Sequence, residues 1–387
     1  MVPYDACMRP FHLLALLFVF VELAVPGAVR GQGSGHSATD WQLKPSLKYD
    51  ALCLLNSLGG DPYYLRYYRK EYEHFHRLFT PAEQNAFIRL KRILKDEGHG
   101  IISAKLALYF STVGDETLPE MIRTAHESSA MKLALEKTEY WDEGEWRNYE
   151  AARPALEDAL KALDRVGFAA YWEANAKPRI EKRIAELTRD LPRYDIVGLI
   201  EADLGFRLPS HAITVYLLAY SEPHGIRITG LRFLTHESYP FEIVLHNAVH
   251  ESMHPPYHLS DPGVQDAIHR LEQDSLVVDK VRHHDPSFGY NTAAGYIEED
   301  SVQALEQLIC EKLGVGRNPC KYWREQDGGM HVLAAALYDG YKQAQSKQPR
   351  PYSRWLVEAV GSGELLGRRL QSKVERFFAD PSCAGAE

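Results

Sequence analysis

The residues with the clearest chemical potential lie in one segment, FEIVLHNAVHESMH, which contains the pattern His-Glu-x-x-His. On a helix, His250 and His254 share one face because they are four residues apart, so both imidazoles can bind one metal ion. Glu251 lies beside them, where its carboxylate can take a proton from water. Neutral imidazole suits zinc, and a catalytic zinc site combines three protein ligands with one open position. The pattern therefore predicts a hydrolytic Zn²⁺ site.

This segment resembles the active-site helix of the zincin metallopeptidases. In those enzymes the His-Glu-x-x-His helix follows a sheet whose edge strand aligns a peptide. The resemblance extends over about residues 205 to 310. It implies an enzyme that hydrolyses a peptide or protein substrate, with Zn²⁺ held by His250 and His254 and with Glu251 as general base.

Histidine is concentrated around the motif, but a third histidine ligand is not indicated. Eight of the 17 histidines lie between positions 236 and 284, where an even spread would place about two. A metzincin would carry a histidine ten residues after His250, and that position is Ser260. His258 has the wrong spacing for that pattern. His246 is expected to orient His250 or to pack against it.

A glutamate on a later helix is the alternative third ligand, as in gluzincins. Glu298 and Glu299 both fit, because each shares a face with apolar residues of a helix predicted from about residue 294 to 313. The residues around Glu299 resemble the gluzincin pattern Trp-Leu-x-Glu-Gly-x-Ala, with Val302 in place of the small residue. The resemblance favours Glu299 as the ligand and leaves Glu298 as the alternative. A solvated helix start is the other interpretation of both acids.

Two prolines directly follow the motif. Proline disfavours helical geometry in the residue before it, so Pro255 predicts that the helix ends or kinks at His254. The second histidine is then expected on the last turn of the helix.

A zinc hydrolase also needs a donor to the developing oxyanion, often a tyrosine or a histidine. The downstream candidates are Tyr290, His331, Tyr338 and Tyr341. Of these, His331 opens an apolar helix, so a role in the core or as a cap is favoured for it.

Three regions are predicted along the chain. Residues 1–31 are typical of a signal peptide, because an apolar run over 13–25 follows Arg9 and precedes Pro26 and Gly27. They indicate a secreted or periplasmic protein, with an uncleaved anchor as the alternative. Residues 40–190 form a predicted helical region, with helical periodicity from about Trp41. Residues 191–387 form the predicted zincin-like catalytic domain.

The predicted fold class is α+β and predominantly helical, with a small antiparallel or mixed sheet before the motif helix. The stretches 211–220 and 225–234 are rich in β-branched and aromatic residues and predict adjacent antiparallel strands. A helix over about 241–254 follows them, and loops are expected up to about residue 290. Further helices are predicted near 294–313, 330–346 and 353–377.

Composition excludes several classes of protein. The formal charge of −9 and the pI of about 6.0 leave no basic domain that would bind nucleic acid. After removal of the signal peptide, no stable membrane span is expected. Four cysteines then remain, and they permit two disulfides in three connectivities: Cys53, Cys310, Cys320 and Cys383. We expect Cys310 to pair with Cys320 and Cys53 with Cys383, with four buried thiols as the alternative.

A second interpretation belongs to another class of function. A non-catalytic exported protein could hold a structural zinc, closed by a fourth protein ligand such as His246 or His258. Its N-terminal helices would then bind a partner. In a third interpretation, a helical scaffold carries the motif by chance.

Overall fold

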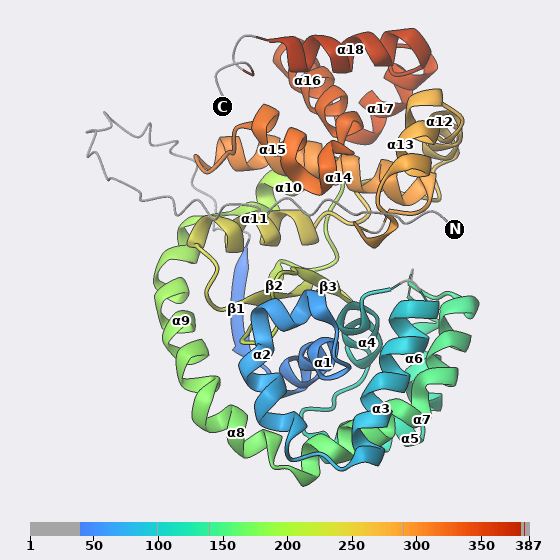
Figure 1. The fold of residues 1–387 in the computed structure, drawn as a ribbon. Helices are drawn as coiled ribbons and strands as arrows, with labels where there is room; N and C mark the ends of the chain where they lie inside the picture. The colour runs from blue at the N-terminus through green and yellow to red at the C-terminus, as the bar shows by residue number, and fades with distance from the viewer. Residues whose placement is uncertain (1–38, 99, 139, 289, 381–382, 384–387) are drawn as a thin grey trace, which may run out of the picture. The chain divides into compact units, whose positions relative to one another are not determined.

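Helices dominate the structure and surround one small sheet (Figure 1). The computed structural model describes residues 39–380 and 383, apart from positions 99, 139 and 289, and these residues belong to one compact unit. The predicted fold class is confirmed: the fold is predominantly helical α+β, with a small mixed sheet before the motif helix. The predicted signal peptide, residues 1–31, lies outside the described residues.

The sheet has four strands in the order β1-β2-β4-β3. They are β1 (Asp40–Pro45), β2 (Ala212–Leu218), β3 (Ile226–Ile228) and β4 (Arg232–His236). β2 pairs in parallel with β1 and with β4, whereas β3 pairs antiparallel with β4 at the edge. The antiparallel pairing predicted between the stretches 211–220 and 225–234 is therefore wrong. The second stretch is itself a hairpin, which turns at Gly230 with a positive φ of 72°.

β1 was not predicted, since the helical pattern was expected from Trp41. Trp41 and Leu43 lie beside Ile213 and Val215 of β2 in parallel register. Six residues are too few for periodicity to distinguish a strand from a helix, and the partner strand is distant in sequence. The first helix begins only after Ser46, whose side chain accepts the backbone N–H of Tyr49 at 3.2 Å.

Helices follow one another between β1 and β2. α3 begins at a reciprocal capping box formed by Thr80 and Glu83. The helices are α1 (Leu47–Leu58), α2 (Pro62–His76), α3 (Pro81–Lys91), η1 (Arg92–Glu97), α4 (Ile102–Phe110), α5 (Leu118–His126), α6 (Ser129–Leu135), α7 (Glu143–Arg165), α8 (Phe168–Asn175), α9 (Lys177–Asp190), η2 (Leu191–Arg193) and α10 (Ile196–Leu204).

The chain after the sheet is also helical. Its helices are α11 (Phe241–Glu251), α12 (Pro262–Glu272), α13 (Ser275–His283), η3 (Pro286–Phe288), α14 (Ala293–Lys312), α15 (Pro319–Glu325), η4 (Gln326–Gly329), α16 (Val332–Lys347), α17 (Tyr352–Gly361) and α18 (Gly367–Ala379). α14 and α16 confirm two predicted helices, whereas the predicted helix over 353–377 is divided into α17 and α18. The loops expected up to residue 290 are wrong, because Asp261 and Asp274 cap α12 and α13 there.

α11 and α14 position the candidate site. α11 packs on β4 and on α14, and so lies between the sheet and the C-terminal helices (Figure 1). α14 is buried along most of its length, including the carboxylates of Glu299, Asp300 and Glu306. Buried carboxylates are costly without partners, so their contacts are central to the site.

The disulfide pairing differs from the prediction. Cys320, at the start of α15, is bonded to Cys383, while Cys53 and Cys310 are buried free thiols. Proximity along the chain favoured Cys310 for Cys320. The fold instead brings the C-terminal segment to α15, where Arg324 donates to the carbonyl oxygen of Cys383 at 2.8 Å.

We expect the Cys320→Ser/Cys383→Ser variant to lose about 3–4 kcal/mol of unfolding free energy. The bond closes a loop with a sequence separation of 63, and a crosslink of this length removes much conformational entropy from the unfolded chain. Urea unfolding measures the loss. A reductant should lower the midpoint of the wild type to that of the variant and leave the variant unchanged. An unfolding midpoint of the wild type that is the same with and without the reductant would contradict the disulfide.

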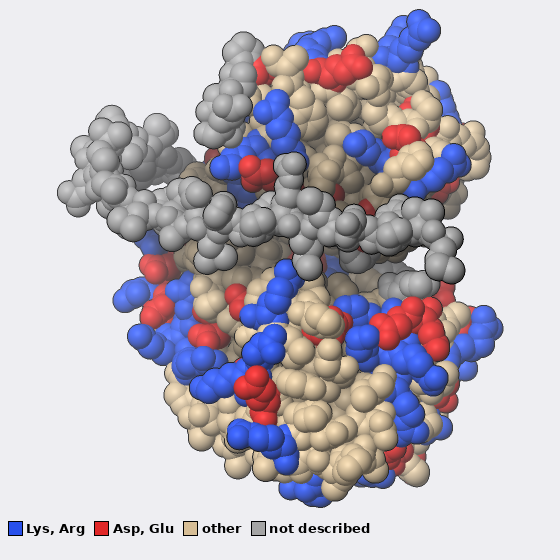
Figure 2. Space-filling model, viewed as in Figure 1, with Lys and Arg blue, Asp and Glu red and all other residues tan. Residues whose placement is uncertain are grey.

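The charged surface is mixed on the face drawn in Figure 2, where basic and acidic side chains are interspersed over the described residues. Within the described part of the chain, no helix has the length and apolar character of a membrane span.

Candidate metal centre

α11 ends at Glu251, earlier than predicted, so His254 lies beyond the helix and not on its last turn. Pro255 is one reason that the helix does not continue. In a continued helix the N–H of residue 255 would bond the carbonyl of Glu251, and proline has no N–H. The guanidinium of Arg227, in β3, donates to that carbonyl instead, at 2.8 Å. This bond ties the end of α11 to the edge strand.

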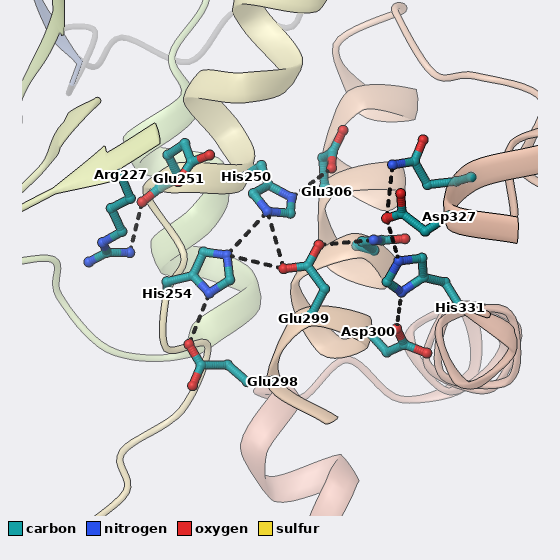
Figure 3. Close-up of polar contacts among 12 residues, drawn as sticks. Arg227, His250, Glu251, His254, Glu298, Glu299, Asp300, Glu306, Asp327 and His331 are labelled. Atoms are coloured by element: carbon teal, nitrogen blue, oxygen red, sulfur yellow. Dashed lines mark hydrogen bonds and ion pairs between the residues drawn. The ribbon is translucent and has the colours of Figure 1, made fainter. Parts of the chain in front are cut away.

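The side chains predicted as metal ligands nevertheless converge (Figure 3). Nε2 of His250 lies 3.1 Å from Nε2 of His254. Oε2 of Glu299 lies 3.6 Å from the first nitrogen and 3.7 Å from the second. The structure thus brings together His250, His254 and Glu299 from the end of α11, the following turn and the start of α14.

These separations fit a tetrahedral ion. Ligand atoms about 2.0–2.1 Å from zinc at tetrahedral angles lie about 3.4 Å from one another. The three observed separations, 3.1, 3.6 and 3.7 Å, bracket that value. Two imidazoles and one carboxylate are also a donor set that zinc prefers. No fourth His, Cys, Asp or Glu joins this group among the described residues.

Glu298, the alternative third ligand, contacts the other side of His254. Its Oε1 lies 2.9 Å from Nδ1 of His254, opposite the nitrogen that faces Glu299. A carboxylate at Nδ1 fixes the ring orientation and leaves Nε2 free for a metal. Glu298 is therefore placed to orient a ligand, while Glu299 is placed to be one.

Glu306 is a site residue that the sequence analysis missed. Its Oε2 lies 3.0 Å from Nδ1 of His250, and its Oε1 lies 2.6 Å from Nδ1 of His246. Arg317 approaches the same carboxylate at 3.2 Å. His246 therefore acts on His250 through Glu306. A signal existed, because Glu306 lies seven residues after Glu299, two turns along one helix face.

We expect Glu306→Gln to weaken zinc binding about 10–100-fold, because a carboxylate partner orients the histidine ligand and increases its basicity. Competition with a chromophoric chelator measures the affinity. Glu311→Gln is the matched control, since Glu311 lies on the same helix and bonds Lys342. Equal zinc affinities of wild type and Glu306→Gln would contradict the orienting role.

A chain of hydrogen bonds holds the carboxylate of Glu299. Its Oε1 accepts from Nε2 of Gln303 at 2.9 Å, and Oε1 of Gln303 accepts from the indole of Trp323 at 3.0 Å. Gln303 and Trp323 are both buried. The orientation of Glu299 is thus fixed by α14 and α15 together.

His331 lies to the right of Glu299 in Figure 3, between Asp327 and Asp300, and it has the core role that the sequence favoured. Its ring bonds Asp300 at 2.6 Å and Asp327 at 3.0 Å, and it is fully buried. Burial lowers the pKa of His331, but the two carboxylates, Asp300 above all, outweigh it and raise the pKa to about 10. His331 therefore joins α14 to the start of α16 as a charged group.

The electrostatics of the site favour a cation. Burial lowers the pKa of His250, but Glu299 and Glu306 outweigh burial and raise that pKa well above its usual value. For Glu299, burial acts to raise the pKa, and His250 and His254 reverse the shift to well below its usual value. The two shifts are reciprocal: the buried carboxylates stabilise the protonated form of His250, and the imidazoles stabilise the ionised form of Glu299.

The site opens into a cleft. His250, Glu251 and Glu299 line a cavity of about 440 Å³, together with Tyr290. Tyr290 is the one predicted oxyanion donor among the described residues of this lining. Tyr338 and Tyr341 bond Glu311 and the carbonyl of Asp203 instead.

Other candidates of the sequence analysis lie elsewhere. The ring of His258 packs on Phe206, with 4.1 Å between centroids. A second group, His246, Glu306 and Cys310, is also close enough to hold an ion. However, both ring nitrogens of His246 already bond oxygens, one from Glu306 and one from the carbonyl of Val315 at 2.7 Å.

The chain matches no family model, and comparisons with curated proteins and with solved structures return no match.

Proposed function

We propose that this chain is a zinc-dependent hydrolase, and specifically a metallopeptidase. The convergence of His250, His254 and Glu299 at tetrahedral separations is the observation that carries the proposal. Three ligands beside a cleft are typical of a catalytic zinc site, whereas a structural site is closed by four protein ligands.

The chemistry is divided between the ion and the chain. Zinc at these ligands supplies a Lewis acid that lowers the pKa of water to near 7. Glu251 lines the same cleft, where its carboxylate accepts the proton of the attacking water and passes it to the leaving amine. Arg227 positions Glu251 by holding the end of α11.

The edge strand supports a peptide substrate. The chain that enters β3, Pro223 to Gly225, lines the cleft. A Cβ built on Gly225 would lie 3.5 Å from Oε1 of Glu251, so the backbone passes close to the proposed base. An extended peptide that adds main-chain hydrogen bonds at this edge would have its carbonyl groups beside Glu251.

We assign Tyr290 as the donor to the developing oxyanion. Tyr290 lines the cleft with Glu251 and Glu299. Burial is the largest influence that raises the pKa of Tyr290, and Glu299, Asp327 and Glu251 raise it further, so the phenol stays protonated. We expect Tyr290→Phe to lower kcat about 10²–10³-fold, with zinc content unchanged. Tyr338→Phe is the control, because Tyr338 bonds Glu311 outside the cleft. Unaltered kcat in Tyr290→Phe would remove Tyr290 from the mechanism.

The disulfide supports export. Such bonds persist in oxidising compartments, as expected for a secreted or periplasmic protein, and Cys320 is bonded to Cys383.

Peptide cleavage tests the proposal. Zinc-loaded protein should cleave a mixture of peptides, as followed by mass spectrometry. 1,10-Phenanthroline should stop the cleavage, and added zinc should restore it. Zinc-loaded protein that leaves both peptide mixtures and unfolded proteins intact would contradict the proposal.

A further inference from the structure

The lining of the cleft is mainly polar, but it includes exposed aromatic side chains. Seven large hydrophobic side chains among the described residues are exposed, and two of them, Tyr63 at 40% and Phe288 at 38%, line this cleft. Exposed apolar groups that gather in a cleft mark a ligand-binding surface, whereas isolated ones need no explanation. The position of this pair beside Glu251 therefore points to the substrate.

One wall of the cleft is aromatic and firmly held. Tyr63, in the first turn of α2, stacks on His224 with 6.4 Å between ring centroids and 24° between planes. Nε2 of His224 is 3.0 Å from the hydroxyl of Tyr64, which fixes the imidazole. Tyr64 itself is buried, so this wall is preformed.

His224 presents an uncharged face. Burial, and then the nearby Lys95, lower the pKa of His224 to about 4. The ring is therefore neutral at physiological pH. Together with Tyr63, whose ring centre lies 4.4 Å from the Arg66 guanidinium, it offers a flat aromatic surface.

Phe288 is the third aromatic side chain in the lining of this cleft. It ends η3 and lies against η4, where a Cβ built on Gly328 would be 3.6 Å from its ring. Asp327 is next to Gly328 in η4. Burial is the largest influence on both pKa values: it raises the pKa of Tyr63 and lowers that of His224. Asp327 is a further influence that raises the pKa of both residues. Asp327 is thus within electrostatic range of Tyr63 and His224, and Phe288 lines the same cavity as these two residues.

The aromatic wall is next to the reacting groups. His224 directly precedes Gly225, whose Cβ position is 3.5 Å from Oε1 of Glu251. A substrate side chain held by the aromatic residues of this cleft would therefore belong to a residue that flanks the scissile bond.

We propose that Tyr63, His224 and Phe288 form a specificity subsite that binds an aromatic or large aliphatic side chain of the peptide, next to the bond that is cleaved. The proposal rests on the proposed function, whose substrate class it narrows.

Two otherwise identical alanine-rich peptides, one with a single central Phe, test the subsite. We expect zinc-loaded protein to cleave the Phe peptide with a kcat/KM at least about tenfold higher, the discrimination that an apolar pocket provides. Tyr63→Ala and Phe288→Ala should each reduce this ratio several-fold. Tyr67→Ala should retain it, because Tyr67 is an equally exposed tyrosine of α2 at 39% that does not line the cleft.

A binding measurement separates failure of the subsite from failure of the proposed function. Zinc-loaded Glu251→Gln should bind the labelled Phe peptide at least about tenfold more tightly than the alanine peptide in fluorescence anisotropy. Selective binding without cleavage by the wild type would overturn the proposed function and retain the subsite. Equal affinity for the two peptides, or selectivity that survives both Tyr63→Ala and Phe288→Ala, would overturn the subsite.

Discussion

Glu251→Gln should reduce peptide hydrolysis about 10²–10⁴-fold while zinc stays bound, since this is the range that a positioned acid–base group contributes. Glutamine has nearly the same shape but cannot take a proton from water. The metal site should be unaffected, because Glu251 is not one of the three convergent side chains. Its backbone bond to Arg227 is also preserved, since the carbonyl is unchanged. Steady-state kinetics and zinc analysis of the same preparation measure both effects.

Glu242→Gln is the matched control for this variant. Glu242 lies in the first turn of α11 and is exposed, so its replacement changes the charge of the same helix far from the cleft. The control should keep wild-type kcat/KM. Full activity in Glu251→Gln would eliminate Glu251 as the base.

The second large effect is expected at Glu299. Glu299→Gln should lower zinc affinity by more than 100-fold, beyond the 10–100-fold that loss of an orienting residue costs. The reason is that Oε2 of Glu299 is the third atom of the convergent set. Glu298→Gln should cost only about tenfold, because Glu298 contacts Nδ1 of His254.

The paired variants decide between two adjacent glutamates with one measurement, zinc affinity by chelator competition. Both changes remove one negative charge from the start of α14, so a general electrostatic effect would weaken binding equally in the two proteins. A larger loss in Glu298→Gln than in Glu299→Gln would reverse the assignment of the third ligand.

The sequence identified much of the metal centre because its pattern is local. His250, Glu251 and His254 lie in one motif, and the α14 helix that carries Glu299 has a clear apolar period. The orienting groups were missed since they depend on packing between distant elements. Glu306 acts on His250 across the contact of α11 with α14, and Trp323 reaches Glu299 only through Gln303.

The errors in the fold have physical causes of the same kind. β1 is short and pairs with a strand about 170 residues away, so no local pattern distinguishes it. The stretch predicted as one strand is a hairpin because Gly230 permits a tight turn. α12 and α13 were missed although Asp261 and Asp274 are good N-caps, since polar residues around them resemble loops. Cys320 bonds Cys383 because the fold, not the sequence distance, brings them together.

Zinc content of the purified protein beside that of His250→Ala tests the central claim most directly. His250 contributes one of the three convergent atoms and is oriented by Glu306, so no other described side chain is positioned to replace it. The account predicts one equivalent of zinc in the wild type after equilibration with the metal and loss of that zinc from His250→Ala. Equal zinc in the two proteins would contradict it.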